Sequence, residues 1–119
     1  LITLADQDPA VVRALAETLD VHFADFRDSD PGAIGWARER QLLDWVVPFH
    51  EGAVAHWRAA GVWTDAHQAH NDALLRRQAV LADAWAAHRA AGGDADAWLA
   101  RRGRALADAG LEPLFAPTE

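Results

Sequence analysis

The stretch of residues 65–91 constrains the fold most, because it contains neither proline nor glycine and lies between Thr64 and Gly92-Gly93. Threonine can cap the start of a helix, and a glycine pair can end it. At 1.5 Å per residue, such a helix would be about 40 Å long. Apolar side chains fall on one of its faces: Leu74, Leu81 and Trp85. We therefore predict one long helix near residues 65–91.

Two repeated start signals divide the first half of the chain. Asp8-Pro9 combines an N-cap with a first helical residue and predicts a helix over about residues 9–24. Asp30-Pro31 repeats the signal and predicts a shorter helix through Leu42, although two glycines weaken it. The apolar run 43–47 is consistent with either a helix end or extended chain.

The second half carries equally plain boundaries. Residues 51–60 are predicted to form a short helix, for which Gly61 supplies the C-cap. Asp94 is expected to cap a last helix that runs to about Ala109 and stops at Gly110.

The two ends of the chain lack helical patterns. Leu1–Leu4 has strand composition, and its sheet partners would lie outside this segment. The tail from Pro113 to Pro117 is expected to be extended. The fold class is thus all-α, with about five helices. Residues 1–119 form a single helical segment without an internal boundary, since no linker or repeat interrupts them.

Composition excludes several classes of function. The net charge of -7 repels a phosphate backbone, so nucleic acid is not an expected partner. Without cysteine, neither disulfides nor thiolate metal sites can form. No apolar run reaches the length of a membrane span, so the chain is not itself expected to cross a bilayer. All eleven cationic residues are arginine, which we attribute to genomic base bias.

Histidines are the obvious candidates for chemistry. His67 and His70 stand three residues apart, a spacing that can place two imidazoles on one metal. The same face continues through the apolar stripe to Trp85, which we expect to be buried against the first or last helix. Histidines on such a stripe are typically packed and singly hydrogen-bonded. We therefore predict no metal site.

No arrangement typical of an enzyme is present. His50 and Glu51 could be imagined as base and acid, but no nucleophile stands in a suitable context, and Ser29 is the only serine. His50 is better interpreted as fixing the backbone that enters a helix. Motifs for phosphate, dinucleotide or zinc binding are also missing, so we predict no catalytic residues and no cofactor. The candidates for ligand binding are His50, Trp57 and Trp63.

One segment resembles a known family. The motif is Val47-Pro48-Phe49-His50-Glu51-Gly52-Ala53-Val54, followed by Trp57, Gly61, Val62, Trp63 and Thr64. It resembles the C-terminal region of TAXI-type solute-binding proteins of TRAP (tripartite ATP-independent periplasmic) transporters. That family typically shows a proline, a hydrophobic residue, His-Pro-Gly-Ala, an aromatic pair and a glycine. Here Glu51 stands at the usual proline, and His56-Trp57 replaces the commoner tyrosine pair. The likeness covers about residues 1–91.

The resemblance implies a role in bacterial transport. The chain would be the C-terminal part of a two-lobed α/β periplasmic binding protein. Such a receptor binds a small organic solute, here expected to be an organic acid, and delivers it to TRAP permease subunits in the inner membrane. This segment would act as a buttress, with the motif around His50 as a lobe-stabilising turn. The alternative is a stand-alone helical module whose tryptophan-bearing face docks a partner protein.

Overall fold

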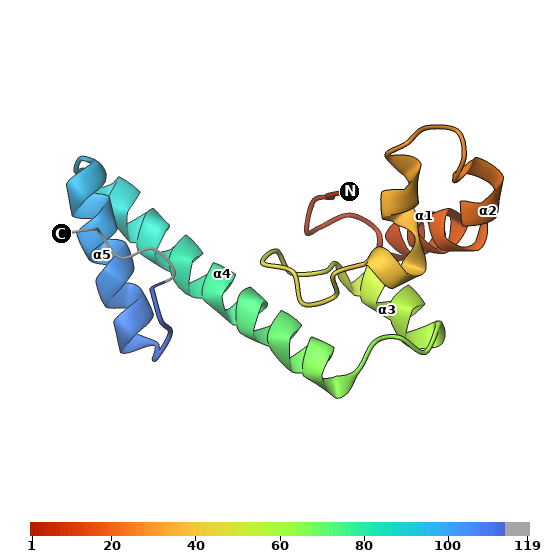
Figure 1. Cartoon of the computed structure of the whole chain (residues 1–119). Coiled ribbons are helices and arrows are strands. Elements are labelled where there is room, and N and C mark those ends of the chain that lie inside the picture. The colour runs from red at the N-terminus through yellow and green to blue at the C-terminus, as the bar shows by residue number, and fades with distance from the viewer. Residues whose placement is uncertain (114–119) are drawn as a thin grey trace. The chain divides into compact units, whose positions relative to one another are not determined.

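The computed structural model describes residues 1–113, which are helical and contain no strand (Figure 1). The elements are α1 (Pro9–Val21), α2 (Phe23–Phe26), the 3-10 helices η1 (Ala33–Trp36) and η2 (Arg38–Arg40), α3 (Glu51–Ala59), α4 (Asp65–Ala91) and α5 (Ala95–Asp108). The prediction of an all-α chain with five α-helices is confirmed for these residues. The long helix also lies at the predicted position.

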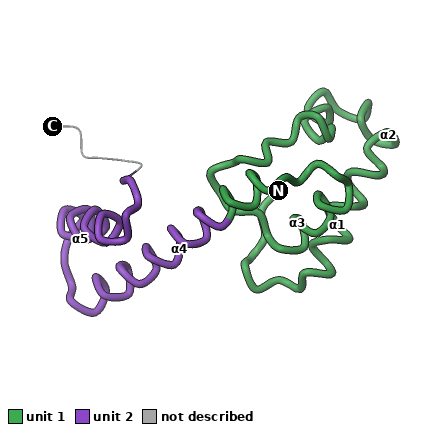
Figure 2. Tube along the Cα trace, turned by 90° about the horizontal axis from the view of Figure 1, so that it is seen from below, with its two compact units in different colours: residues 1–71 green, residues 72–119 purple. Residues whose placement is uncertain are grey.

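The chain divides into two compact units, Leu1–Asn71 and Asp72–Glu119, drawn in green and purple in Figure 2. Helix α4 begins in the first unit and continues in the second. Most contacts between residues fall within one unit or the other. The expectation of one segment over residues 1–119 stays a prediction.

In the first unit, α1 packs against α3. The Asp8 carboxylate accepts a hydrogen bond from the Ala10 N–H at 2.8 Å, and Pro9 occupies the first helical position. The predicted helix over 9–24 is interrupted at His22, whose φ of -94° and ψ of 12° leave the helical region. A separate turn, α2, follows, and the His22 ring is hydrogen-bonded to Asp25 at 2.9 Å.

The core of the first unit is built around two tryptophans and a valine, Val54, Trp57 and Trp63. The Phe49 ring meets Trp63 edge-on, with the ring centroids 5.5 Å apart. The indole N–H of Trp63 donates to the Gln68 Oε1 at 3.0 Å, so this buried ring has a polar partner. Half-buried apolar side chains complete the cluster: Leu43, Ala53, Ala60 and Val62.

The predicted helix from Asp30-Pro31 through Leu42 is wrong. The segment forms η1 and η2, which are separated at Ala37, where φ is -56° and ψ is 140°. Two glycines lower the helix propensity of this segment. Residues 43–47 contain neither helix nor strand, and Leu1–Leu4 is exposed and likewise forms no strand.

The boundaries of α3 and α4 follow the predicted chemistry. Gly61 has a φ of 75°, as a glycine after a helix end commonly does. Thr64 and His67 form a reciprocal cap at the start of α4. The His67 N–H donates to the Thr64 Oγ1 at 3.2 Å, and the Thr64 N–H donates to the His67 Nδ1 at 3.1 Å.

The second unit contains the larger part of α4 together with the whole of α5. Gly92 ends α4 with a φ of 70°, and the Asp94 carboxylate caps α5 by accepting from the Ala97 N–H at 3.0 Å. Leu106 is fully buried. Arg76 donates to the Ala109 carbonyl at 2.6 Å, and Arg77 donates to the Glu112 carbonyl at 2.7 Å. These bonds satisfy carbonyls at and beyond the C-terminal end of α5.

The expected burial of Trp85 is wrong, since this residue is 45% exposed. Its ring does contact the last helix: the centroids of Trp85 and Trp98 are 4.9 Å apart in an edge-on arrangement. Trp85 also stacks on the buried His88 at 5.3 Å. It therefore covers α5 with one face and leaves much of its surface to solvent. Of the tail predicted to be extended, residues 114–117 lie outside the described residues.

Candidate functional site

The turn at residues 48–53 positions the first of the predicted site residues. His50 is the N-cap of α3, and its Nδ1 accepts a hydrogen bond from the Gly52 N–H at 3.1 Å. The prediction that His50 fixes the backbone entering a helix is confirmed. Just before it, the Phe49 N–H donates to the Asn71 Oδ1 at 2.7 Å. The turn is therefore tied to α3 on one side and to α4 on the other.

Gly52 brings the backbones of α3 and α1 into direct contact. A Cβ built at this position would overlap the carbonyl oxygen of Pro9. It would also lie 2.9 Å from the Arg13 nitrogen and 3.0 Å from the Val12 Cβ. Backbone atoms cannot give way as a flexible side chain can. Glycine is therefore the residue that this helix crossing accepts.

Trp57 and Trp63, the other two candidates, lie in the core of the first unit. They are 7% and 8% exposed, respectively. Trp57 contacts the His56 ring, with centroids 4.8 Å apart, and Trp63 contacts Phe49 and His67. The structure thus brings all three candidates into one region, but as packed and capping side chains. Little of either indole surface is left for a ligand.

A buried carboxylate forms the second polar centre of this unit. The Asp20 side chain is only 3% exposed and accepts two hydrogen bonds from Arg38: Nε to Oδ1 at 2.9 Å and Nη2 to Oδ2 at 2.6 Å. The Nε2 of His56 lies 2.9 Å from Oδ2. Because an ionised carboxylate can only accept, Nε2 carries the proton in this pair. Asp20 thereby connects α1, η2 and α3.

The electrostatics of this centre favour the ionised carboxylate. Hydrogen bonding from Arg38 lowers the pKa of Asp20 below its ordinary value, and His56 acts in the same direction, while burial opposes both. The same hydrogen bond raises the pKa of Arg38. The His56 side chain is 8% exposed, so Asp20 and His56 are both closed to substrate. This arrangement fits a structural connection between three elements.

Sequence reasoning missed this centre and the role of Asn71. One signal was present for Asp20: an acidic residue in the last turn of a helix faces the negative end of the helix dipole and benefits from a cationic partner. Nothing in the local sequence identifies Arg38 or His56 as that partner, because they follow Asp20 by 18 and 36 residues. Asn71 is similarly an ordinary polar residue within a helical pattern.

His67 and His70 are half-buried and occupied by hydrogen bonds. His67 takes part in the cap of α4, and the Nε2 of His70 lies 2.8 Å from the Trp45 carbonyl oxygen. Across residues 1–113, no three His, Asp or Glu side chains come together in a group that could hold a metal ion. Over the same range, no helix combines the length and the apolar character that crossing a membrane requires.

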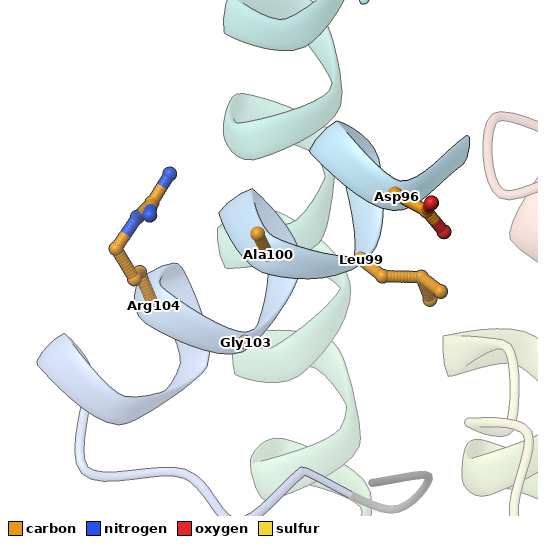
Figure 3. A pocket seen from close by; sticks show the side chains of 5 residues that line it. All are labelled: Asp96, Leu99, Ala100, Gly103 and Arg104. Atoms are coloured by element: carbon orange, nitrogen blue, oxygen red, sulfur yellow. The ribbon is translucent and has the colours of Figure 1, made fainter. Parts of the chain in front are cut away.

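A hollow lies on the exposed side of α5 in the second unit (Figure 3). Its lining comes from one helix face: Asp96, Leu99, Ala100, Gly103 and Arg104. Leu99 is 45% exposed, although it lies on the same side of the helix as the fully buried Leu106, two turns further along. The small side chains in the middle of the face form its floor, and an acidic and a basic residue stand at its two ends.

Comparison with known proteins adds no relative. The chain matches no protein-family model, no curated protein and no solved structure. The resemblance to TAXI-type proteins therefore rests on the residues themselves, above all on the segment 47–64.

Proposed function

We propose that this chain is the C-terminal segment of a periplasmic solute receptor of the TAXI type, which binds a small organic acid for delivery to a TRAP permease. The observation that carries the proposal is the turn at residues 48–53. The histidine and the glycine of the resembling motif each have a structural task here. His50 caps α3, and Gly52 admits the backbone of α1. A motif with these tasks acts as a lobe-stabilising turn and leaves recognition of the solute to other residues.

The departure at Glu51 is compatible with this family. Glu51 is the first residue of α3, the position at which proline is most readily accepted in a helix. His50 has a φ of -65° and a ψ of 145°, the extended conformation that a residue before proline prefers. The local backbone would therefore accept the family's usual His-Pro-Gly-Ala sequence unchanged. The match between this backbone conformation and the family's sequence supports the proposal more directly than the residues that the two motifs share.

The exposed apolar surface also fits a segment that is covered by a larger protein. Many large hydrophobic side chains of the first unit are exposed, which is costly for an isolated domain. The most exposed are Leu1, Ile2, Leu4, Val21, Val46, Leu42, Val11 and Trp45. In a two-lobed receptor, the remaining α/β structure would cover part of this surface.

The same surface favours one alternative, a helical module that docks a partner protein. Trp36 and Trp45 are 38% and 51% exposed, and interfaces are enriched in tryptophan. In either case the chain would be non-enzymatic. The one buried acid–base pair described within residues 1–113, Asp20 and His56, is closed to substrates and tied to Arg38.

Calorimetric titration of the full-length gene product with a panel of mono- and dicarboxylic acids tests the proposal. Saturable one-to-one binding of at least one acid is expected. The variant His50→Ala should lower the unfolding temperature and leave the affinity of the folded protein unchanged. A gene product without two α/β lobes, or one that binds no acid in the panel, would overturn the proposal in favour of the docking module.

A further inference from the structure

The face of α5 that lines the hollow is complementary to itself. Asp96 and Arg104 each lie four residues from Ala100, at opposite ends of the hollow. At 1.5 Å per residue, each is about 6 Å along the helix axis from Ala100. Both side chains are exposed, and within residues 1–113 neither forms an ion pair. The face therefore offers two unpaired opposite charges at equal distances from its centre.

We propose that this face is a homodimer contact, in which two copies of α5 pack antiparallel about a two-fold axis at Ala100. A two-fold axis pairs each patch with the same patch on the other copy. Two reciprocal ion pairs result, because each Asp96 faces Arg104 of the second copy. The partner is a second copy of this chain, since another protein would have to carry the same charges at the same spacing.

Apolar packing follows from the same axis. In this register, Leu99 lies at the axial level between Ala100 and Gly103 of the second copy. Small residues permit close approach of two helices, and the interaxial distance depends on the side chains at the contact. Leu99 is 45% exposed, and a Cβ at Gly103 would have no atom within 4 Å, so the floor of the hollow is open. The exposed leucine of each copy fills the hollow of the other.

Sedimentation equilibrium of the protein at concentrations from about 1 µM to about 1 mM tests whether it dimerises. A dimer with a small interface is expected to have a dissociation constant within this range. The reversals Asp96→Arg and Arg104→Asp should each weaken dimerisation by about tenfold or more, because each places like charges opposite one another. Asp108→Arg is the matched control. It reverses an exposed charge of the same helix that does not line the hollow, and it should leave the dimer unchanged. Circular dichroism verifies that each variant is folded.

The decisive sample is an equimolar mixture of the two reversal variants. In a mixed dimer, the arginine introduced in one copy faces the aspartate introduced in the other, and the native Arg104 of the first copy faces the native Asp96 of the second. Both pairs are of opposite charge, so association should return to the wild-type level. The double variant Asp96→Arg/Arg104→Asp should also dimerise like the wild type. A wild-type protein that stays monomeric throughout, or a mixture that does not recover, would overturn the proposal.

Discussion

The side-chain amide of Asn71 spans the backbone of Phe49. Its Oδ1 accepts from the Phe49 N–H at 2.7 Å, and its Nδ2 donates to the Phe49 carbonyl at 3.3 Å. Asn71 is 4% exposed and lies 22 residues beyond Phe49. One side chain of α4 thus satisfies both backbone groups of a residue in the irregular segment before α3. This relationship holds the turn at residues 48–53 in place.

Asn71→Ala should lower the free energy of unfolding by about 2–3 kcal/mol, because it leaves two part-buried backbone groups of Phe49 without their partner. Denaturant unfolding measures this change. His70→Ala is the matched control: it removes one bond to the more exposed Trp45 carbonyl and should cost less than about 1 kcal/mol. Equal losses for the two variants would contradict the importance of the Phe49 contact.

Gly52→Ala should destabilise the protein by about 1–3 kcal/mol or more, because its Cβ would meet backbone atoms of α1. Thermal unfolding followed by circular dichroism measures the loss. Gly35→Ala serves for comparison, since a Cβ at that position meets nothing within 4 Å. That variant should be neutral or slightly stabilising. A harmless Gly52→Ala would show that α1 and α3 do not approach so closely.

Glu51→Pro should change the free energy of unfolding by less than about 0.5 kcal/mol, because Glu51 is the first residue of α3. That position needs no N–H, and the φ of a helix matches the φ that the proline ring fixes. Ala55→Pro, in the middle of the same helix, should cost about 3 kcal/mol or more. The pair is compared by denaturant unfolding. If Glu51→Pro were as damaging as Ala55→Pro, the structural case for the family resemblance would fail.

The Asp20 centre predicts a loss of stability in acid. Since the folded state lowers the pKa of Asp20, its contribution is complete above the unfolded pKa and is lost as the pH falls through the folded pKa. The stability difference between wild type and Asp20→Asn should therefore be largest near neutral pH. It should shrink below about pH 4, where an unperturbed aspartate takes up its proton. Denaturant unfolding across this range measures it, and a difference independent of pH would refute the assignment.

In the second unit, Leu106→Ala should be more destabilising than Trp85→Ala. Leu106 is fully buried, and its truncation should cost about 2–5 kcal/mol through lost transfer energy and a cavity. Trp85 is 45% exposed, so its truncation should cost less than the roughly 3–5 kcal/mol of a buried aromatic ring. Unfolding of the two variants under identical conditions ranks them. A larger loss for Trp85→Ala would restore the burial expected from the sequence.

Local chemistry in the sequence determined the helices that carry strong boundary signals. Asp8-Pro9, Thr64 and Asp94 each cap a helix as predicted, and Gly61, Gly92 and Gly110 follow helix ends with positive φ. These signals act within a few residues, so they can be read without knowledge of the fold. The long helix α4 and the capping role of His50 follow from the same kind of reasoning.

Only the tertiary structure decided which side chains are buried and which residues far apart in the chain form ion pairs. The segment after Asp30-Pro31 has a start signal but forms two 3-10 turns, from which Arg38 reaches Asp20. Trp57 and Trp63 are buried while Trp85 is half exposed, although all three are tryptophans within or beside helices. Burial and ion pairing depend on which surfaces meet in space. That information lies in contacts between residues far apart in the chain, which no local pattern carries.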